Sequence, residues 1–155
     1  MAARGSKREY IQSISEQGGL HMASIQDIEG VGDQYADKLR AIGIASTDSL
    51  LEKGATAKGR ADIVTKSGIG AKLILRWVNH SDLFRIKGVA GQYSELLEAA
   101  GVDTVVELSK RKADNLYEMM VKTNGEKRMV RALPSQDKVT DWVAQAKALP
   151  RKVQY

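Results

Sequence analysis

Three short turns in this chain combine glycine with one hydrophobic residue, and each precedes a stretch of helical pattern. They are Ile28-Glu29-Gly30-Val31-Gly32, Ser67-Gly68-Ile69-Gly70-Ala71-Lys72 and Lys87-Gly88-Val89-Ala90-Gly91. Glycine permits a tight turn with positive φ, and a helix that starts there presents unpaired backbone N–H groups. These amides and the helix dipole can cradle phosphate or another anion. Contacts of this kind reach backbone phosphate and no base edge, so binding would be independent of nucleotide sequence.

The turn at Gly68–Gly70 is the strongest phosphate candidate, because no acidic residue stands beside it. Lys72 and Arg76 follow at a spacing of four, which predicts that they share the solvent face of one helix. By contrast, Glu29 and Asp33 flank the first turn and would repel phosphate. For all three turns the alternative stays open that glycine only lets two helices pack closely. The candidate nucleic-acid-binding residues are Gly30, Gly32, Gly68, Ile69, Gly70, Lys72, Arg76, Lys87, Gly88, Val89 and Gly91.

No other pattern in the sequence points to catalysis or to a cofactor. Cysteine is absent, which excludes disulfide scaffolds, thiol catalysis and zinc sites built on cysteine. His80 and Asp82 have no second histidine or carboxylate cluster to complete a metal site, and a helix cap is the simpler role for them. Neither a Ser-His-Asp order nor a Walker loop is found. We therefore expect a non-enzyme without metal or cofactor.

The turns are set in a chain whose hydrophobic pattern is helical throughout. Apolar residues recur at helical spacing, and strand-like alternation is missing. Ser46 and Ser135 are predicted N-caps, and Gly43 is a predicted helix stop. Asn124-Gly125 is interpreted as the turn between two helices. The sequence thus predicts an all-α fold of short helices, with Trp77 and Trp142 as core residues on apolar helix faces.

Two segments of the chain align without gaps at an offset of 58 residues. IEGVGDQY at 28–35 matches IKGVAGQY at 86–93, and the same offset pairs Leu39 with Leu97 and Gly43 with Gly101. The sequence therefore predicts two tandem related halves, at about residues 22–82 and 83–155.

Composition fits one globular domain, with 43% hydrophobic residues and a formal net charge of +5. Met1–His21 is polar, and a His-Met pair is typical of a vector junction, so residues 1–21 are interpreted as an expression leader or flexible N-terminal segment. A native docking peptide there stays open. No apolar run is long enough for a membrane span, and we expect a cytoplasmic protein with no membrane partner. Arg151-Lys152 is expected to fray.

Each Gly-hydrophobic-Gly turn with its following helix resembles the helix-hairpin-helix motif, which is associated with sequence-independent contacts to DNA. From Ile25 to Tyr155 the chain also resembles a bacterial family known as domain of unknown function four-three-three-two, placed near the helix-hairpin-helix group. The most specific matching pieces are IEGVGDQYADKLRAIGI and LPSQDKVTDWVAQAKAL. The family name implies little about activity, whereas the resemblance to the helix-hairpin-helix motif implies a non-catalytic binding module for double-stranded DNA. A protein-interaction or adaptor domain without nucleic acid is the alternative, favoured by carboxylates such as Glu29 and Asp33.

Overall fold

The computed structural model describes residues 23–155, and within this range the chain forms helices and turns without a named strand. This confirms the all-α prediction for these residues, while the predicted leader, residues 1–21, lies outside them. The elements are η1 (Ile25–Asp27), α2 (Asp33–Ala41), α3 (Thr47–Gly54), α4 (Ala57–Ser67), α5 (Ala71–Leu83), α6 (Gly91–Ala99), α7 (Val105–Ser109), α8 (Ala113–Lys127) and α9 (Gln136–Ala148).

Side-chain caps begin α3 and α9 at the residues that the sequence singles out. The Ser46 hydroxyl accepts a hydrogen bond from the Ser49 amide at 3.1 Å, and the Ser135 hydroxyl accepts one from the Lys138 amide at 3.2 Å. Gly43 follows α2 with a φ of 88°, as expected for a glycine that ends a helix.

The prediction of a turn at Asn124-Gly125 is wrong, because α8 continues through both residues to Lys127. The Asn124 side chain has a different role. Its Nδ2 donates to the Val130 carbonyl at 3.1 Å and its Oδ1 accepts from the Val130 amide at 2.9 Å. Asn124 therefore holds the segment that follows α8, and the chain leaves the helix at Arg128.

Arg128 ends α8 in the left-handed region, with a φ of 50°, and is the one described non-glycine residue with positive φ. A side chain makes this conformation unfavourable by about 1–2 kcal/mol relative to glycine. We expect Arg128→Gly to raise the free energy of unfolding by about 1 kcal/mol, measured by urea denaturation. Arg128→Ala removes the same charge but keeps a Cβ, so it should bring no such gain; an equal gain from both variants would contradict the explanation.

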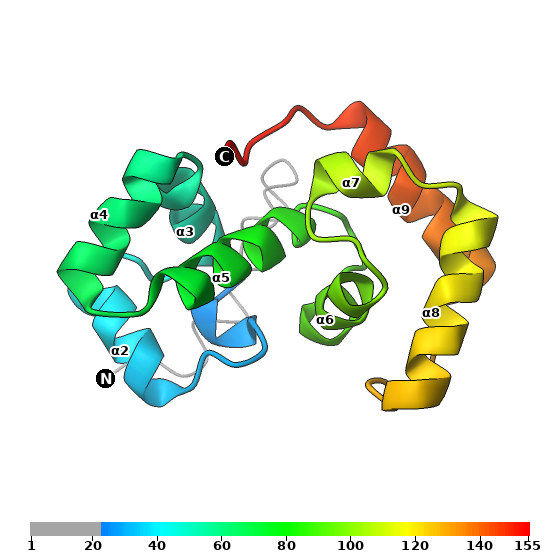
Figure 1. Cartoon of the computed structure of the whole chain (residues 1–155), viewed down its shortest axis with the longest axis horizontal. Coiled ribbons are helices and arrows are strands. Elements are labelled where there is room, and N and C mark those ends of the chain that lie inside the picture. The colour runs from blue at the N-terminus through cyan, green and yellow to red at the C-terminus, as the bar shows by residue number, and fades with distance from the viewer. Residues whose placement is uncertain (1–22) are drawn as a thin grey trace, which may run out of the picture.

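The described chain has two hydrophobic cores, each built around one tryptophan. Figure 1 shows the two groups of helices that surround them, with α5 running between the groups. Trp77 on α5 lies in the core of residues 23–82, which we call the first half. Trp142 on α9 lies in the core of residues 83–155, the second half. Their side chains are 0% and 1% exposed, which confirms the prediction that both are core residues.

The 58-residue offset pairs Tyr35 with Tyr93 and Lys53 with Arg111, and these residues make matching contacts in the two halves, although the two tryptophans are 65 residues apart. Tyr35 packs on Trp77 with ring centroids 5.1 Å apart, and Tyr93 packs on Trp142 at 5.5 Å. Lys53 and Arg111 each bond the carbonyl of a glycine that follows a helix, Gly43 after α2 and Gly101 after α6. Lys53 Nζ donates to Gly43 at 3.4 Å, and Arg111 Nη2 donates to Gly101 at 3.1 Å. Gly30 and Gly88 have φ values of 92° and 95°.

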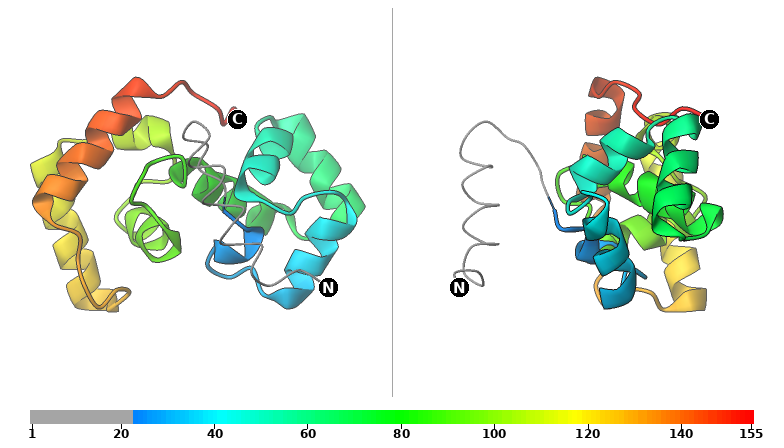
Figure 2. Two further views of the ribbon diagram at one scale, coloured as in Figure 1. Left: turned by 180° about the vertical axis from the view of Figure 1, so that it is seen from behind. Right: turned by 90° about the vertical axis from the view of Figure 1, so that its left-hand side faces the viewer.

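The two halves are joined by α5 and by the C-terminal segment. Leu83 belongs to the second core, whereas the adjacent Phe84 belongs to the first. After α9 the chain runs back to the first half, as both faces of the molecule show (Figures 1 and 2). The prediction that Arg151-Lys152 frays is therefore wrong, because Val153 just beyond is buried in the first core.

Candidate nucleic-acid interface

The turn from α4 to α5 keeps its glycines in solvent and its hydrophobic residue in the core. Gly68 ends α4 with a φ of 74°, and Gly70 is the N-cap of α5. Ile69 between them is 2% exposed. Ser67 steadies the corner, because its hydroxyl accepts from the Ile69 amide at 3.1 Å and donates to the Ile63 carbonyl at 2.6 Å.

The backbone amides at the start of α5 point to an anion-binding role. Among the described residues, none provides a hydrogen-bond acceptor for the amides of Gly70, Ala71, Lys72 and Leu73. The first turn of α5 contains no acidic residue, and Lys72 is exposed. A Cβ at either glycine would meet no atom within 4 Å, so the surface around the turn is open. A phosphate could approach these amides without displacing a protein group.

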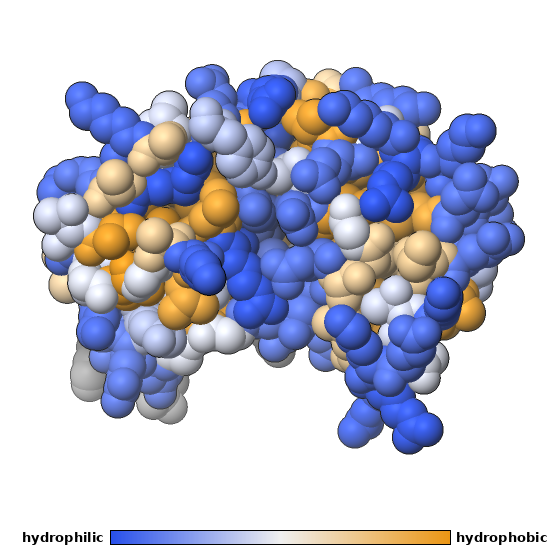
Figure 3. All heavy atoms as spheres, viewed as in Figure 1, coloured by the Kyte–Doolittle hydropathy of each residue, from blue (hydrophilic) through white to orange (hydrophobic). Residues whose placement is uncertain are grey.

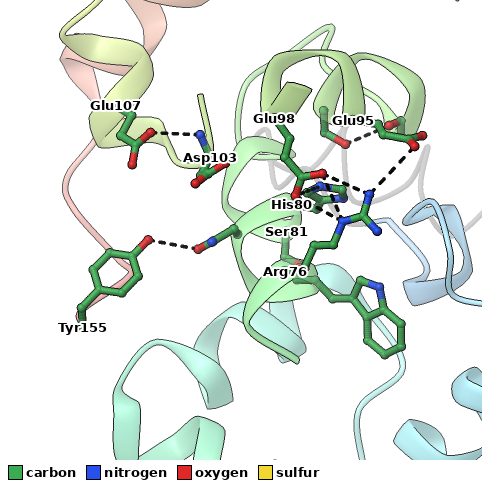
Figure 4. A network of polar contacts seen from close by, with 12 residues as sticks. Arg76, His80, Ser81, Glu95, Glu98, Asp103, Glu107 and Tyr155 are labelled. Carbon is green, nitrogen blue, oxygen red and sulfur yellow. Dashed lines mark hydrogen bonds and ion pairs between the residues drawn. The ribbon is translucent and has the colours of Figure 1, made fainter. Parts of the chain in front are cut away.

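Arg76 does not lie with Lys72 on an open face. Its Nε and Nη2 bond the Glu98 carboxylate of α6 at 3.0–3.2 Å, and Nη2 lies 3.9 Å from Glu95 (Figure 4). The guanidinium thus links the two halves and has its charge offset by two carboxylates. Arg76 is 38% exposed, but its pairing with Glu98 leaves Lys72 as the cation of this helix that is available to a phosphate.

The first turn is also exposed, but its surroundings are acidic. Gly30 and Gly32 reach solvent, while Val31 between them is 5% exposed. Asp33 occupies the first turn of α2, where its Oδ1 accepts from Gln26 Nε2 at 2.7 Å. A carboxylate at this helix start already satisfies the dipole and repels a phosphate.

The turn at residues 87–91 is bonded and packed by other parts of the protein. The Lys87 amide donates to Gln145 Oε1 at 2.8 Å, and Gln145 Nε2 donates back to the Lys87 carbonyl at 3.2 Å. Gly88 packs on the Trp142 indole, where a Cβ would lie 3.0 Å from Nε1. Val89 is 2% exposed. Phosphate contacts at this turn stay a prediction.

Gly91, the last residue of the turn at residues 87–91, is buried against the first half. A Cβ there would lie 2.5 Å from the Asp27 carbonyl oxygen and 3.4 Å from Glu29 Oε1. A cavity of about 390 Å³ opens beside it, and its lining includes Asp27 and Glu29. These carboxylates disfavour phosphate at the start of α6.

The structure adds a buried polar cluster that sequence reasoning missed. Asp82, 1% exposed, accepts from Arg85 Nη1 at 2.8 Å and from the Val105 amide at the start of α7 at 2.8 Å. The sequence predicts a helix-capping role at 79–82; in the structure α5 runs on to Leu83, and Asp82 accepts from the first amide of α7, beside the N-cap Thr104. The spacing of three between Asp82 and Arg85 was the available signal.

His80 is wholly buried at the junction of the halves. Its Nε2 lies 3.2 Å from Glu98 Oε2 without hydrogen-bond geometry, and Nδ1 has no partner among the described residues. Burial lowers the pKa of His80 below its usual value, against the raising effect of Glu98 and with a lowering effect from Arg76. The imidazole is therefore neutral at pH 7.

The lowered pKa of His80 predicts an acid-dependent loss of stability. The unfolded chain binds a proton at a pKa of about 6.5 that the folded chain rejects, so the free energy of unfolding should fall as the pH drops from 7.5 to 5.5. Asp103, whose pKa burial raises, acts in the opposite sense at lower pH. Urea denaturation of His80→Gln should show a smaller fall over this range. An unchanged pH dependence in the variant would contradict the assignment.

The described residues contain neither a metal-binding cluster nor a membrane-spanning helix. Between residues 23 and 155, no group of three or more His, Cys, Asp or Glu side chains could hold a metal ion. Over the same range, no helix has the length and apolarity to cross a membrane.

Over the described residues the protein is all-helical, with two tryptophan-centred cores and, at the start of α5, an exposed glycine turn whose helix has no acidic residue in its first turn. The chain belongs to the family described as Domain of unknown function (DUF4332), whose model matches residues 29–149. Neither the curated proteins nor the solved structures contain a match to the chain.

Proposed function

We propose that the chain is a non-catalytic module that binds the backbone of double-stranded DNA, built from two tandem copies of a helix-hairpin-helix unit. The duplication is supported by the matched Tyr–Trp pairs and by the matched glycines that end α2 and α6. Each half then contains a helical hairpin, a short connecting helix and a second hairpin. In the first half these are η1–α2, α3 and α4–α5; in the second they are the end of α5 with α6, α7 and α8–α9.

The observation that carries the proposal is the open start of α5. Amides from Gly70 to Leu73 that no described residue pairs, a first turn of α5 without an acidic residue and the exposed Lys72 together suit one backbone phosphate. The buried Ile69 side chain anchors the turn in the first core, so the amides are already in place before a phosphate binds.

The second half would supply further cationic contacts. It carries thirteen Lys and Arg against nine Asp and Glu, whereas the described part of the first half carries eight of each. Exposed Arg128 and Arg131 occupy the α8–α9 turn, the counterpart of the Gly68–Gly70 turn in the other half. Figure 1 shows these two turns toward opposite ends of the molecule, so a duplex touching both would lie along its length.

Lys72→Ala tests the phosphate contact directly. Affinity for a fluorescent 20-base-pair duplex of arbitrary sequence should fall linearly on a plot of log affinity against log salt. Loss of one phosphate contact should reduce the magnitude of that slope by about one. The measurement is fluorescence anisotropy at several salt concentrations between about 20 and 200 mM, where counterion release is readily resolved.

Lys38→Ala is the matched control, because it removes one exposed lysine from the last turn of α2, beside Asp37. It should leave the slope unchanged. Equal slopes for wild type and Lys72→Ala would contradict the contact. Absence of binding at the lowest salt would contradict the function and favour the protein-interaction alternative.

A further inference from the structure

The C-terminal segment lies on the first half as an extended chain. Val153 is 3% exposed and belongs to the first core, although it follows α9 of the second half. The Gln154 amide donates to the Ala55 carbonyl at 2.7 Å, and Arg60 Nη2 donates to the Gln154 carbonyl at 2.8 Å. The backbone of one residue is thus held on both sides.

Arg60 forms one wall of the surface that receives this segment. Its Nη1 donates to the carbonyls of Gly54 and Ala55 at 2.9 and 3.2 Å, so the corner between α3 and α4 fixes the guanidinium in place. The same guanidinium lies 5.7 Å from the centre of the Tyr155 ring, a cation–π distance. The side chain therefore contacts backbone and aromatic ring of the segment together.

Asn79 of α5 receives the far end of the segment. The Tyr155 hydroxyl donates to Asn79 Oδ1 at 3.3 Å, and Figure 4 shows the ring reaching toward α5. At the near end, Arg85 Nη2 donates to the Pro150 carbonyl at 2.6 Å. Residues 150–155 thus bridge the two halves. Figure 3 shows a largely hydrophilic band on this face, between two regions where hydrophobic residues reach the surface.

We infer that the surface formed by the α3–α4 corner, Arg60 and Asn79 is a docking groove for an extended segment of the pattern Val-x-Tyr, occupied here by the chain's own residues 153–155. Main-chain hydrogen bonds hold the segment, and alternate side chains select it, as in recognition of extended peptides generally. Val153 enters the core and Gln154 is exposed, while Tyr155, 67% exposed, lies on the surface with its ring against Arg60 and its hydroxyl on Asn79. Docking of residues 153–155 holds the second half against the first half and does not depend on nucleic-acid binding. We call this contact the latch.

The groove is tested with the full chain and a free peptide of residues 150–155. Val153→Asp places a carboxylate in the first core and should release the segment. A tethered segment acts at an effective concentration on the order of millimolar, so a latch that is about 99% closed implies peptide binding at roughly 10 μM once the groove is empty. Titration calorimetry should show the peptide binding Val153→Asp at least about tenfold more tightly than wild type.

Lys152→Ala is the control, because Lys152 is exposed and should leave the latch closed. Equal peptide binding by wild type and Val153→Asp, or none by Val153→Asp, would overturn the inference. Hydrogen exchange of wild type decides the matter should Val153→Asp fail to fold. The Gln154 amide should then exchange at least about a hundredfold more slowly than an unfolded chain, because its hydrogen bond to Ala55 opens only when the segment leaves the groove. Exchange at the unfolded rate would overturn the groove.

Discussion

Replacement of Asp82 by alanine should lower the free energy of unfolding by about 3–5 kcal/mol, as is typical when one partner of a buried ion pair is removed. The Asp82 carboxylate bonds both Arg85 and the Val105 amide. Its loss leaves the Arg85 guanidinium, 11% exposed, without its carboxylate and removes the acceptor of the Val105 amide at the start of α7. Since α7 packs on α9, the second half should lose most of this stability. Urea denaturation followed by circular dichroism measures the effect.

Asp62→Ala provides the comparison, because Asp62 also pairs with a cation, Lys66, at 3.0 Å but with both side chains about 60% exposed. Exposed helical pairs contribute about 0.5 kcal/mol or less. If the two alanine variants unfold at similar urea concentrations, the contribution of Asp82 to the free energy of unfolding does not come from its burial.

Gly91→Ala should cost about 1–3 kcal/mol of stability, the range for overpacking a tightly packed site. The added Cβ would lie 2.5 Å from the Asp27 carbonyl oxygen, and backbone cannot move aside as a flexible side chain can. The destabilising contact would lie where α6 of the second half packs against η1 of the first half. Thermal or urea denaturation of the purified variant gives the change.

The same substitution at Gly125 should have the opposite sign. Gly125 lies inside α8, where a Cβ would meet nothing within 4 Å. Alanine exceeds glycine in helix propensity by about 1 kcal/mol, so Gly125→Ala should stabilise. Destabilisation by both variants to the same extent would mean that close packing at Gly91 is not the cause.

Local features of the fold could be predicted from the sequence, because their causes lie within a few residues. The caps at Ser46 and Ser135 and the helix stop at Gly43 depend on backbone groups close in the chain. The burial of Trp77 and Trp142 follows from helical spacing of apolar residues. The Gly68–Gly70 turn was identified for the same reason.

Contacts between distant residues had no comparable signal. Arg76 has the spacing of a solvent-facing cation, but its partner Glu98 lies 22 residues away on another helix. The engagement of Lys87 by Gln145, 58 residues later, is equally invisible in the sequence. Asn124-Gly125 has turn composition, yet its amide side chain bonds Val130 and the helix continues. In each case tertiary packing decides a question that local pattern leaves open.

The amide resonances of Gly70 to Leu73 report most directly on whether the start of α5 receives a phosphate. A ¹H–¹⁵N correlation spectrum recorded while a short duplex is added at low salt should show these four amides shifting first, together with that of Gly68. The shifts should reverse on addition of salt. Duplex binding that leaves these resonances in place, or moves only amides of another surface, would contradict the account.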